Sequence, residues 1–348
     1  MRYKLLGNSG LRVSELCLGT MTFGTDWEWG ADKDESKKIF DIFAEAGGNF
    51  LDTANMYTNG TSEKFVGEFI VTDRDRFVVA TKYTLSMQKD DTNASGNHRK
   101  NLKRSVEASL ERLNTDYIDL LWVHAWDYTT PVAELMRALD DLVRQGKVLY
   151  LGISDTPAWV VARANMLAEE RGLTPFSALQ VKYSLLERTV ERELMPMARE
   201  LDLAVTPWSV IGGGVLSGKY TKSGSEIQAK DSKRVATRDD IPERDMEIAA
   251  VVQKIADEKH ASPVQVAVNW TRQQPGLIIP LIGARTAEQV NDWLGCLDFT
   301  LDYSDLRRLD EVSRIDLGFP HEFLKNDHIL KLVYGDNYDK IDNHHFKS

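Results

Sequence analysis

Cysteine is nearly absent from this chain of 348 residues. The two that occur, Cys17 and Cys296, lie far apart in sequence, and neither has a partner at a spacing typical of metal binding. The sequence therefore argues against a disulfide framework and against a zinc site. We expect both thiols to be buried and reduced.

Basic residues and long apolar runs are also scarce. The chain has 53 Asp and Glu against 43 Lys and Arg, which gives a net charge of -10. Nucleic acids and anionic membranes attract basic surfaces, so we expect neither as a partner. No run of about eighteen apolar residues occurs, and the N-terminus lacks the apolar segment of a signal peptide. We expect a cytoplasmic protein.

Short runs rich in Val, Ile and Leu alternate with amphipathic stretches of helical length, a pattern typical of a parallel sheet. Eight strands are expected, at 16–21, 50–53, 77–82, 118–124, 148–154, 178–181, 204–208 and 278–282. Eight helices are expected, at 33–46, 62–70, 98–113, 131–145, 157–171, 190–201, 244–259 and 286–294.

No phosphate-binding glycine loop follows the first expected strand, which disfavours a doubly wound sheet. Eight strand–helix repeats instead predict an α/β fold of the (β/α)8 TIM barrel type. We predict a barrel domain over residues 1–315, with a hairpin around 7–10 ahead of its first barrel strand. Residues 316–348 form a C-terminal extension, either part of the same domain or partly disordered, and we interpret its final His344-His345 as a solvated tail. The long connection 209–243 suggests a lid or clamp.

Four polar side chains stand where expected strands end, and in a barrel these ends meet at one mouth: Asp52, Tyr57, Lys82 and His124. A tyrosine with a pKa of about 10 is a weak acid, but a nearby ammonium favours its phenolate, and a carboxylate can hold that ammonium charged. We interpret Tyr57 as a general acid, with Lys82 and Asp52 lowering its pKa and His124 orienting a carbonyl oxygen. Taken singly, these residues could also be a structural ion pair, a rim aromatic and a core histidine.

The tetrad and the segment Asp52-Thr53-Ala54-Asn55-Met56-Tyr57 resemble the aldo-keto reductase superfamily, in the branch of potassium-channel β subunits and bacterial ketoreductases. The resemblance covers about residues 1–315. It implies reduction of aldehydes or ketones to alcohols by hydride transfer from NADP(H), with a small-molecule carbonyl compound as the partner.

The resemblance also implies a set of cofactor-binding residues. In it, Ser154 and Gln180 hold the nicotinamide carboxamide, Trp208 stacks on the ring, and Arg285 faces the 2′-phosphate, which favours NADP over NAD. The chain departs from the family at Asp155 and Trp293, where asparagine is usual. The full expected set is Gly19, Thr20, Met21, Ser154, Asp155, Gln180, Trp208, Ser209, Val210, Gly212, Gly214, Lys219, Gly283, Arg285, Gln289 and Asp292.

An aromatic substrate pocket is expected beside Tyr57 and suits flat or apolar carbonyl compounds. Its expected members are Phe23, Trp27, Trp29 and Trp126, together with Met21 and Trp208. Trp27 and Trp29 could instead only pack the long first loop. Two alternative functions stay open at this point: an NADP-binding regulatory subunit with little or no catalysis, and a dehydrogenase that uses NAD in the oxidative direction.

Overall fold

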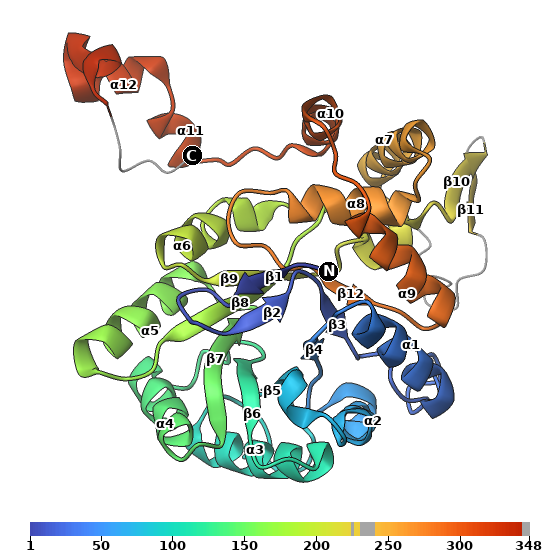
Figure 1. The fold of residues 1–348 in the computed structure, drawn as a ribbon. Coiled ribbons are helices and arrows are strands. Elements are labelled where there is room, and N and C mark those ends of the chain that lie inside the picture. Colours follow the sequence, from blue (N-terminus) through green and yellow to red (C-terminus); the bar gives the residue numbers. More distant parts are fainter. Residues whose placement is uncertain (224–225, 230–240, 343–348) are drawn as a thin grey trace.

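A computed structural model describes residues 1–223, 226–229 and 241–342 and contains one sheet of eight parallel strands. Its strand order is β12-β3-β4-β5-β6-β7-β8-β9, and a parallel bridge between Val205 and Ile278 brings β9 beside the chain that leads into β12. The sheet therefore curls into a barrel (Figure 1), and the predicted TIM barrel is confirmed. The strands are β3 (Cys17–Gly19), β4 (Phe50–Asp52), β5 (Val78–Tyr83), β6 (Ile118–Val123), β7 (Val148–Ser154), β8 (Phe176–Lys182), β9 (Ala204–Trp208) and β12 (Leu281–Gly283).

Helices surround the sheet as the repeat predicts (Figure 1). They are α1 (Lys33–Glu45), α2 (Thr61–Ile70), α3 (Arg99–Leu113), α4 (Val132–Arg144), α5 (Ala158–Arg171), α6 (Leu194–Glu200), α7 (Glu243–Lys259) and α9 (Ala287–Leu294). The helix expected at 190–201 is shorter and is preceded by the 3-10 turn η3 (Thr189–Glu191). Pro196 has no backbone N–H, and it falls in the first turn of α6, where none is needed.

Two further helices, α8 (Pro263–Arg272) and α10 (Tyr303–Ser313), were not predicted. Both begin with a capping box, in which the cap side chain and the third helical residue bond to each other's backbone. Ser262 and Gln265 form the box of α8, and Asp302 and Asp305 form that of α10. Both capping boxes can be recognised in the sequence, although neither segment is among the predicted helices.

The predicted N-terminal hairpin is present as β1 (Tyr3–Leu5) and β2 (Arg12–Ser14). Leu6 and Val13 are fully buried in a cluster with residues of the barrel strands, including Phe50 and Trp122. Gly7 has a φ of +57°, and a Cβ atom there would lie 2.2 Å from the Ser177 carbonyl oxygen. Only glycine therefore fits this close approach of hairpin and barrel.

The long connection after β9 contains the 3-10 segment η4 (Gly212–Ser217) and a second hairpin, β10 (Tyr220–Ser223) and β11 (Glu226–Ala229). Residues 224–225 and 230–240 of this expected lid or clamp lie outside the described part of the chain. Cys17 and Cys296 are both buried and free, as expected.

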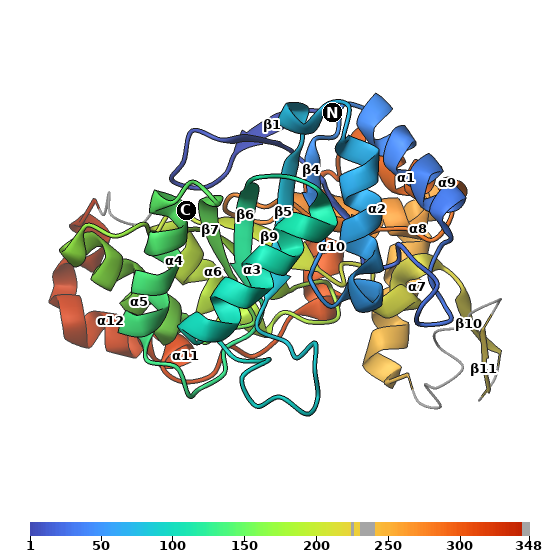
Figure 2. The same ribbon diagram turned by 90° about the horizontal axis from the view of Figure 1, so that it is seen from below.

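Beyond α10 the chain leaves the barrel and forms α11 (His321–Leu324), α12 (Asp327–Tyr334) and η6 (Gly335–Lys340). This extension projects from the side of the molecule (Figures 1 and 2). Its apolar side chains are largely exposed, with Phe319 at 83% and Leu332 at 68%. The expected His344-His345 tail lies outside the described residues. Over the ranges that the structure does describe, no helix has the length and apolar character needed to cross a membrane.

Candidate active site

The carboxyl ends of the barrel strands surround a cavity of about 570 Å³. Asp52 ends β4, His124 directly follows β6, Ser154 ends β7 and Trp208 ends β9. Parallel strands bring these positions to one end of the barrel, and all four residues line the cavity.

Lys82, near the end of β5, is fully buried and joins three groups. Its ammonium donates hydrogen bonds to the Asp52 carboxylate, to the Thr53 carbonyl at 2.8 Å, and to the Tyr57 phenol oxygen at 3.0 Å. The Tyr57 ring lines the cavity, whereas Lys82 lies behind it. The positive charge is therefore held against the phenol without facing a ligand directly.

Burial and charge act in opposite directions on Tyr57. Burial raises the pKa of the Tyr57 phenol, Lys82 lowers it, and Asp52 raises it, so that the pKa lies above its ordinary value. Our prediction that Asp52 helps to lower this pKa is thus wrong in direction, because its charge repels a phenolate. Burial also opposes the charge on Lys82, but Asp52 and Tyr57 more than offset it and raise the pKa of Lys82. In this site the stable pair is a neutral phenol beside an ammonium.

His124 faces the same part of the cavity, with its ring edge-on to Tyr57 and the ring centroids 6.1 Å apart. Burial, and then the charge of Lys82, lower the pKa of His124 to about 3. The imidazole is therefore neutral near pH 7. Its Nδ1 atom is buried and has no hydrogen-bond partner among residues 1–223, 226–229 and 241–342.

Residues of β7, β8 and β9 continue the cavity wall. Gln180 donates to the Asp52 carboxylate at 3.1 Å, and the Trp208 indole donates to the Asp155 carboxylate at 3.2 Å. Desolvation by the surrounding protein raises the pKa of Asp155, and the bond from Trp208 partly offsets this. The buried Ser154 hydroxyl oxygen has no partner in the described chain, so it is available to a polar ligand group.

The chain after β9 wraps around the next part of the cavity. Gly213 and Gly214 have φ values of +67° and +102°, which favour glycine and leave the backbone close to the cavity. Lys219 also lines the cavity and makes no ion pair with a residue whose position is described. A positive charge beside accessible backbone is a suitable environment for phosphate groups.

At the far end, Arg285 just before α9 and Gln289 and Asp292 on α9 line the cavity. The Gln289 side chain accepts a hydrogen bond from the Arg285 backbone at 2.8 Å, and Asp292 accepts one from Gln265 at 3.1 Å. Both side chains are thus fixed by the protein itself. The Arg285 guanidinium forms no ion pair within the described ranges, which leaves its fork of donors free for an anion.

Most of the expected site residues reach this one cavity. Those that line it are Asp52, Tyr57, His124, Gly19, Met21, Ser154, Asp155, Gln180, Trp208, Ser209, Val210, Gly214, Lys219, Gly283, Arg285, Gln289 and Asp292.

The remaining expected residues do not line the cavity, for identifiable reasons. Thr20 and Phe23 are fully buried, the first bonded to the Asp52 carbonyl and to Ser62, the second packed edge-on to Phe69. Gly212 packs against the Leu186 side chain instead, and its neighbour Gly213 lines the cavity.

Three expected aromatic residues lie near the cavity without lining it. Trp27 is edge-on to Tyr57 with centroids 6.4 Å apart, and Trp29 packs on Trp27 at 5.7 Å. Trp126 lines a smaller neighbouring cavity of about 360 Å³. Leu85 lines both cavities, so the two adjoin.

Ten cavity residues are not in the expected set: Thr22, Met56, Leu85, Ile211, Gly213, Ser217, Tyr220, Val264, Leu281 and Trp293. Most are neighbours of expected residues and could have been found from their position. Val264 lies on α8, and nothing in the sequence places that helix beside the cavity. Trp293 was noted only as a departure from the family, yet its buried ring forms part of the wall.

The fold and this cavity define a (β/α)8 barrel with a ligand-sized site at the carboxyl ends of its strands. Residues 15–314 match the Aldo/keto reductase family, and the chain belongs to that family. It is 39% identical to norsolorinic acid reductase of Aspergillus flavus, over 92% of this chain and 83% of the relative. It is 38% identical to an aryl-alcohol dehydrogenase of Pestalotiopsis microspora, over 93% of this chain and 85% of the relative. It is also 38% identical to a putative aryl-alcohol dehydrogenase of Saccharomyces cerevisiae, over 92% and 88%.

Proposed function

We propose that the protein reduces aromatic aldehydes or ketones to alcohols with NADPH, and that Tyr57 is the general acid. The observation that carries this proposal is the Tyr57 phenol, which lines the cavity while the Lys82 ammonium lies 3.0 Å behind it. A raised pKa keeps the phenol protonated and ready to donate, and the adjacent ammonium stabilises the phenolate left after the transfer.

The neutral state of His124 also supports Tyr57 as the general acid. An uncharged imidazole can donate a hydrogen bond to a carbonyl oxygen without competing as an acid, and the Tyr57 and His124 rings are adjacent. The substrate oxygen would then lie between the phenol and the imidazole. Met21, Met56 and Leu85 make the rest of this wall apolar, which suits an aryl group of the kind named for two of the relatives.

The cofactor supplies hydride to the carbonyl carbon when it is bound, and the cavity residues fit a nicotinamide dinucleotide. The unpartnered Ser154 hydroxyl suits the carboxamide, and the Trp208 indole suits stacking by the ring. Lys219 and Arg285 provide two charges without an ionic partner in the described chain, one for the pyrophosphate and one for a 2′-phosphate. We therefore assign NADP as the cofactor.

Tyr57→Phe tests the proposal because it keeps the ring but deletes the acid. We expect kcat for a nitrobenzaldehyde with NADPH to fall at least about a hundredfold, within the range of acid–base contributions. NADPH affinity, measured by fluorescence titration, should change little, because the residues assigned to the cofactor lie on other elements.

The matched control is Tyr128→Phe, since Tyr128 is 74% exposed on the loop after β6 and does not line the cavity. It should retain the kcat of the unchanged protein. A Tyr57→Phe enzyme with near-normal kcat would refute the role of Tyr57. Absence of any carbonyl turnover in the unchanged protein, with NADPH still bound, would favour a regulatory subunit.

A further inference from the structure

Asp155 differs from the other charged groups at the inner end of the cavity because no counter-ion is bonded to it. The carboxylate of Asp52 is paired with the buried ammonium of Lys82. Tyr57 and His124 are neutral near pH 7. Among the described residues at this end of the cavity, Asp155 is therefore the charged group without an ion-pair partner.

Asp155 is accessible from the open cavity that it lines, although the surrounding protein partly desolvates its carboxylate, so its charge acts on whatever occupies the cavity. Its carboxylate accepts a hydrogen bond from the Trp208 indole, a neutral donor, at 3.2 Å. The nearby cation Lys182 lies over the Trp208 ring at 6.0 Å from its centroid and is itself exposed, so water screens it. The carboxylate is thus fixed at the edge of the indole.

Trp208 lies where a nicotinamide ring would stack, according to the proposed function on which this inference rests. Stacked rings have centroids about 4.5–7 Å apart, so a ring on Trp208 would lie near the Asp155 carboxylate. The oxidised nicotinamide ring carries a positive charge and the reduced ring is neutral. A fixed negative charge attracts the first form and is nearly indifferent to the second.

We infer that Asp155 selects the oxidised cofactor: its carboxylate strengthens binding of NADP⁺ relative to NADPH, which a neutral residue at this position would not do. The selection comes from charge alone, because aspartate and asparagine present the same oxygen acceptor to Trp208 and to a carboxamide.

The test measures dissociation constants for NADP⁺ and NADPH separately, by calorimetry, for the unchanged protein and for Asp155→Asn. We expect the dissociation constant of NADP⁺ to rise at least about fivefold and that of NADPH to change less than about twofold. Asp155 has a φ of +42°, a backbone conformation that asparagine and glycine tolerate well. Asp155→Gly is therefore a second neutral variant, expected to shift the ratio in the same direction.

Asp292→Asn is the matched control, since it removes a carboxylate from the far end of the same cavity. It should alter both constants by a similar factor and leave their ratio unchanged. The inference is overturned if the ratio stays within about twofold in both Asp155 variants, or if Asp292→Asn shifts it equally. If the unchanged protein binds neither nucleotide, the proposed function fails as well, so the two failures are distinguishable.

Discussion

Buried polar side chains at the mouth of the barrel are held in different charge states by their neighbours. Asp52 and Lys82 stabilise each other as ions. His124 has no carboxylate partner within the described residues and is kept neutral by burial. The same desolvation thus gives an ion pair at one position and a neutral ring at the next, depending on whether a counter-ion is in contact.

His124 should make stability depend on pH. Its pKa is about 3 in the folded protein against an ordinary value of 6.5, so between these values the unfolded chain binds the extra proton. Stability from this residue is complete above about pH 6.5 and falls as the pH drops toward 3, by up to about 1.4 kcal/mol per pH unit. Urea unfolding at pH 6.5, 5.5 and 4.5 should therefore show a smaller loss for His124→Gln than for the unchanged protein.

The control is His260→Asn, because His260 is exposed at the end of α7 and its φ of +55° suits asparagine. The His260→Asn protein should lose as much stability with falling pH as the unchanged protein. Equal slopes for all three proteins would show that His124 is not desolvated as described.

Arg285 is expected to decide which dinucleotide binds. Arg285→Ala should remove a charge-assisted contact made by the 2′-phosphate alone, worth about 1.5–3 kcal/mol, and so raise the KM for NADPH about tenfold or more. The KM for NADH should change little. Steady-state assays with both cofactors check this, with Arg12→Ala as control because Arg12 is exposed on the hairpin at the other end of the barrel. Equal effects on NADPH and NADH would remove the assignment of Arg285.

Residues at strand ends were the most predictable part of the candidate site. Asp52, Ser154 and Trp208 reach the cavity because a strand fixes the position of its last residue. Loop aromatics were less predictable: Phe23 turns into the core and Trp126 into a neighbouring cavity. Side-chain direction in a loop depends on tertiary packing, which a hydrophobic pattern does not record.

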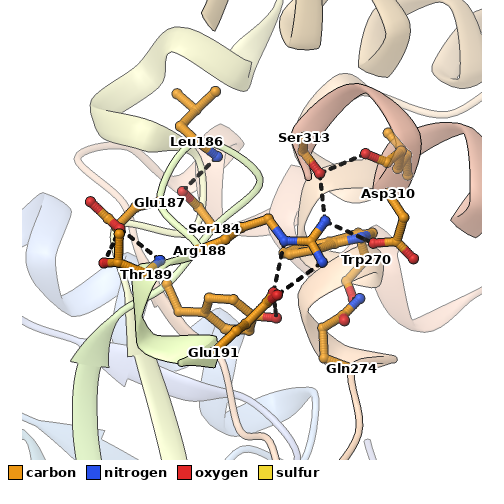
Figure 3. A network of polar contacts seen from close by, with 12 residues as sticks. Ser184, Leu186, Glu187, Arg188, Thr189, Glu191, Trp270, Gln274, Asp310 and Ser313 are labelled. Atoms are coloured by element: carbon orange, nitrogen blue, oxygen red, sulfur yellow. Dashed lines mark hydrogen bonds and ion pairs between the residues drawn. The ribbon is translucent and has the colours of Figure 1, made fainter. Parts of the chain in front are cut away.

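At the scale of elements, a network centred on Arg188 joins the barrel to the unpredicted helices α8 and α10. Figure 3 shows the Arg188 guanidinium between Glu191 of η3 and Asp310 of α10. It binds Glu191 through two nitrogens, at 2.7 and 3.1 Å, and Asp310 at 2.9 Å. It also lies 5.0 Å from the Trp270 ring centroid. One side chain thus ties three elements together, an arrangement that sequence periodicity could not predict.

Arg188→Ala should lower the free energy of unfolding by about 2–4 kcal/mol, because it leaves Glu191 and Asp310 facing each other without their shared cation. Arg188→Lys should recover only part of this loss, since an ammonium cannot reproduce the two-nitrogen contact. Urea unfolding measures both variants. The control Arg307→Ala removes a pair with Glu311 in which both side chains are more than half exposed, so the free energy of unfolding should hardly change. Similar losses for Arg188→Ala and Arg307→Ala would contradict a structural role for the network.

At the scale of the whole molecule, the barrel was predictable because eight repeats of one pattern have few ways to close. The two ends of the chain differ in how far their apolar side chains are buried. The N-terminal hairpin fills the barrel with Leu6 and Val13, whereas the C-terminal extension leaves Phe319 and Leu332 mostly in solvent. Burial of apolar surface is the main source of folding stability, so the two ends should contribute unequally.

Deletion of residues 319–348 should therefore change the free energy of unfolding by less than about 1 kcal/mol, because few buried contacts are lost. The deletion would remove the pairing of His321 with Glu193 at 3.1 Å, which joins this segment to the barrel in the described part of the chain. The Glu193 side chain is 67% exposed. NADPH affinity should also be retained, since no described residue of the extension lines the cavity. Urea unfolding and fluorescence titration of the shortened protein provide the measurements.

A longer deletion, of residues 303–348, is the matched comparison because it also removes α10, with fully buried Leu309 and the Arg188 partner Asp310. Loss of a buried leucine alone costs about 2–5 kcal/mol, so this protein should be severely destabilised or fail to fold. If the shorter deletion already costs more than about 2 kcal/mol, the extension contributes to the barrel's own folding unit, and the predicted boundary near residue 315 is wrong.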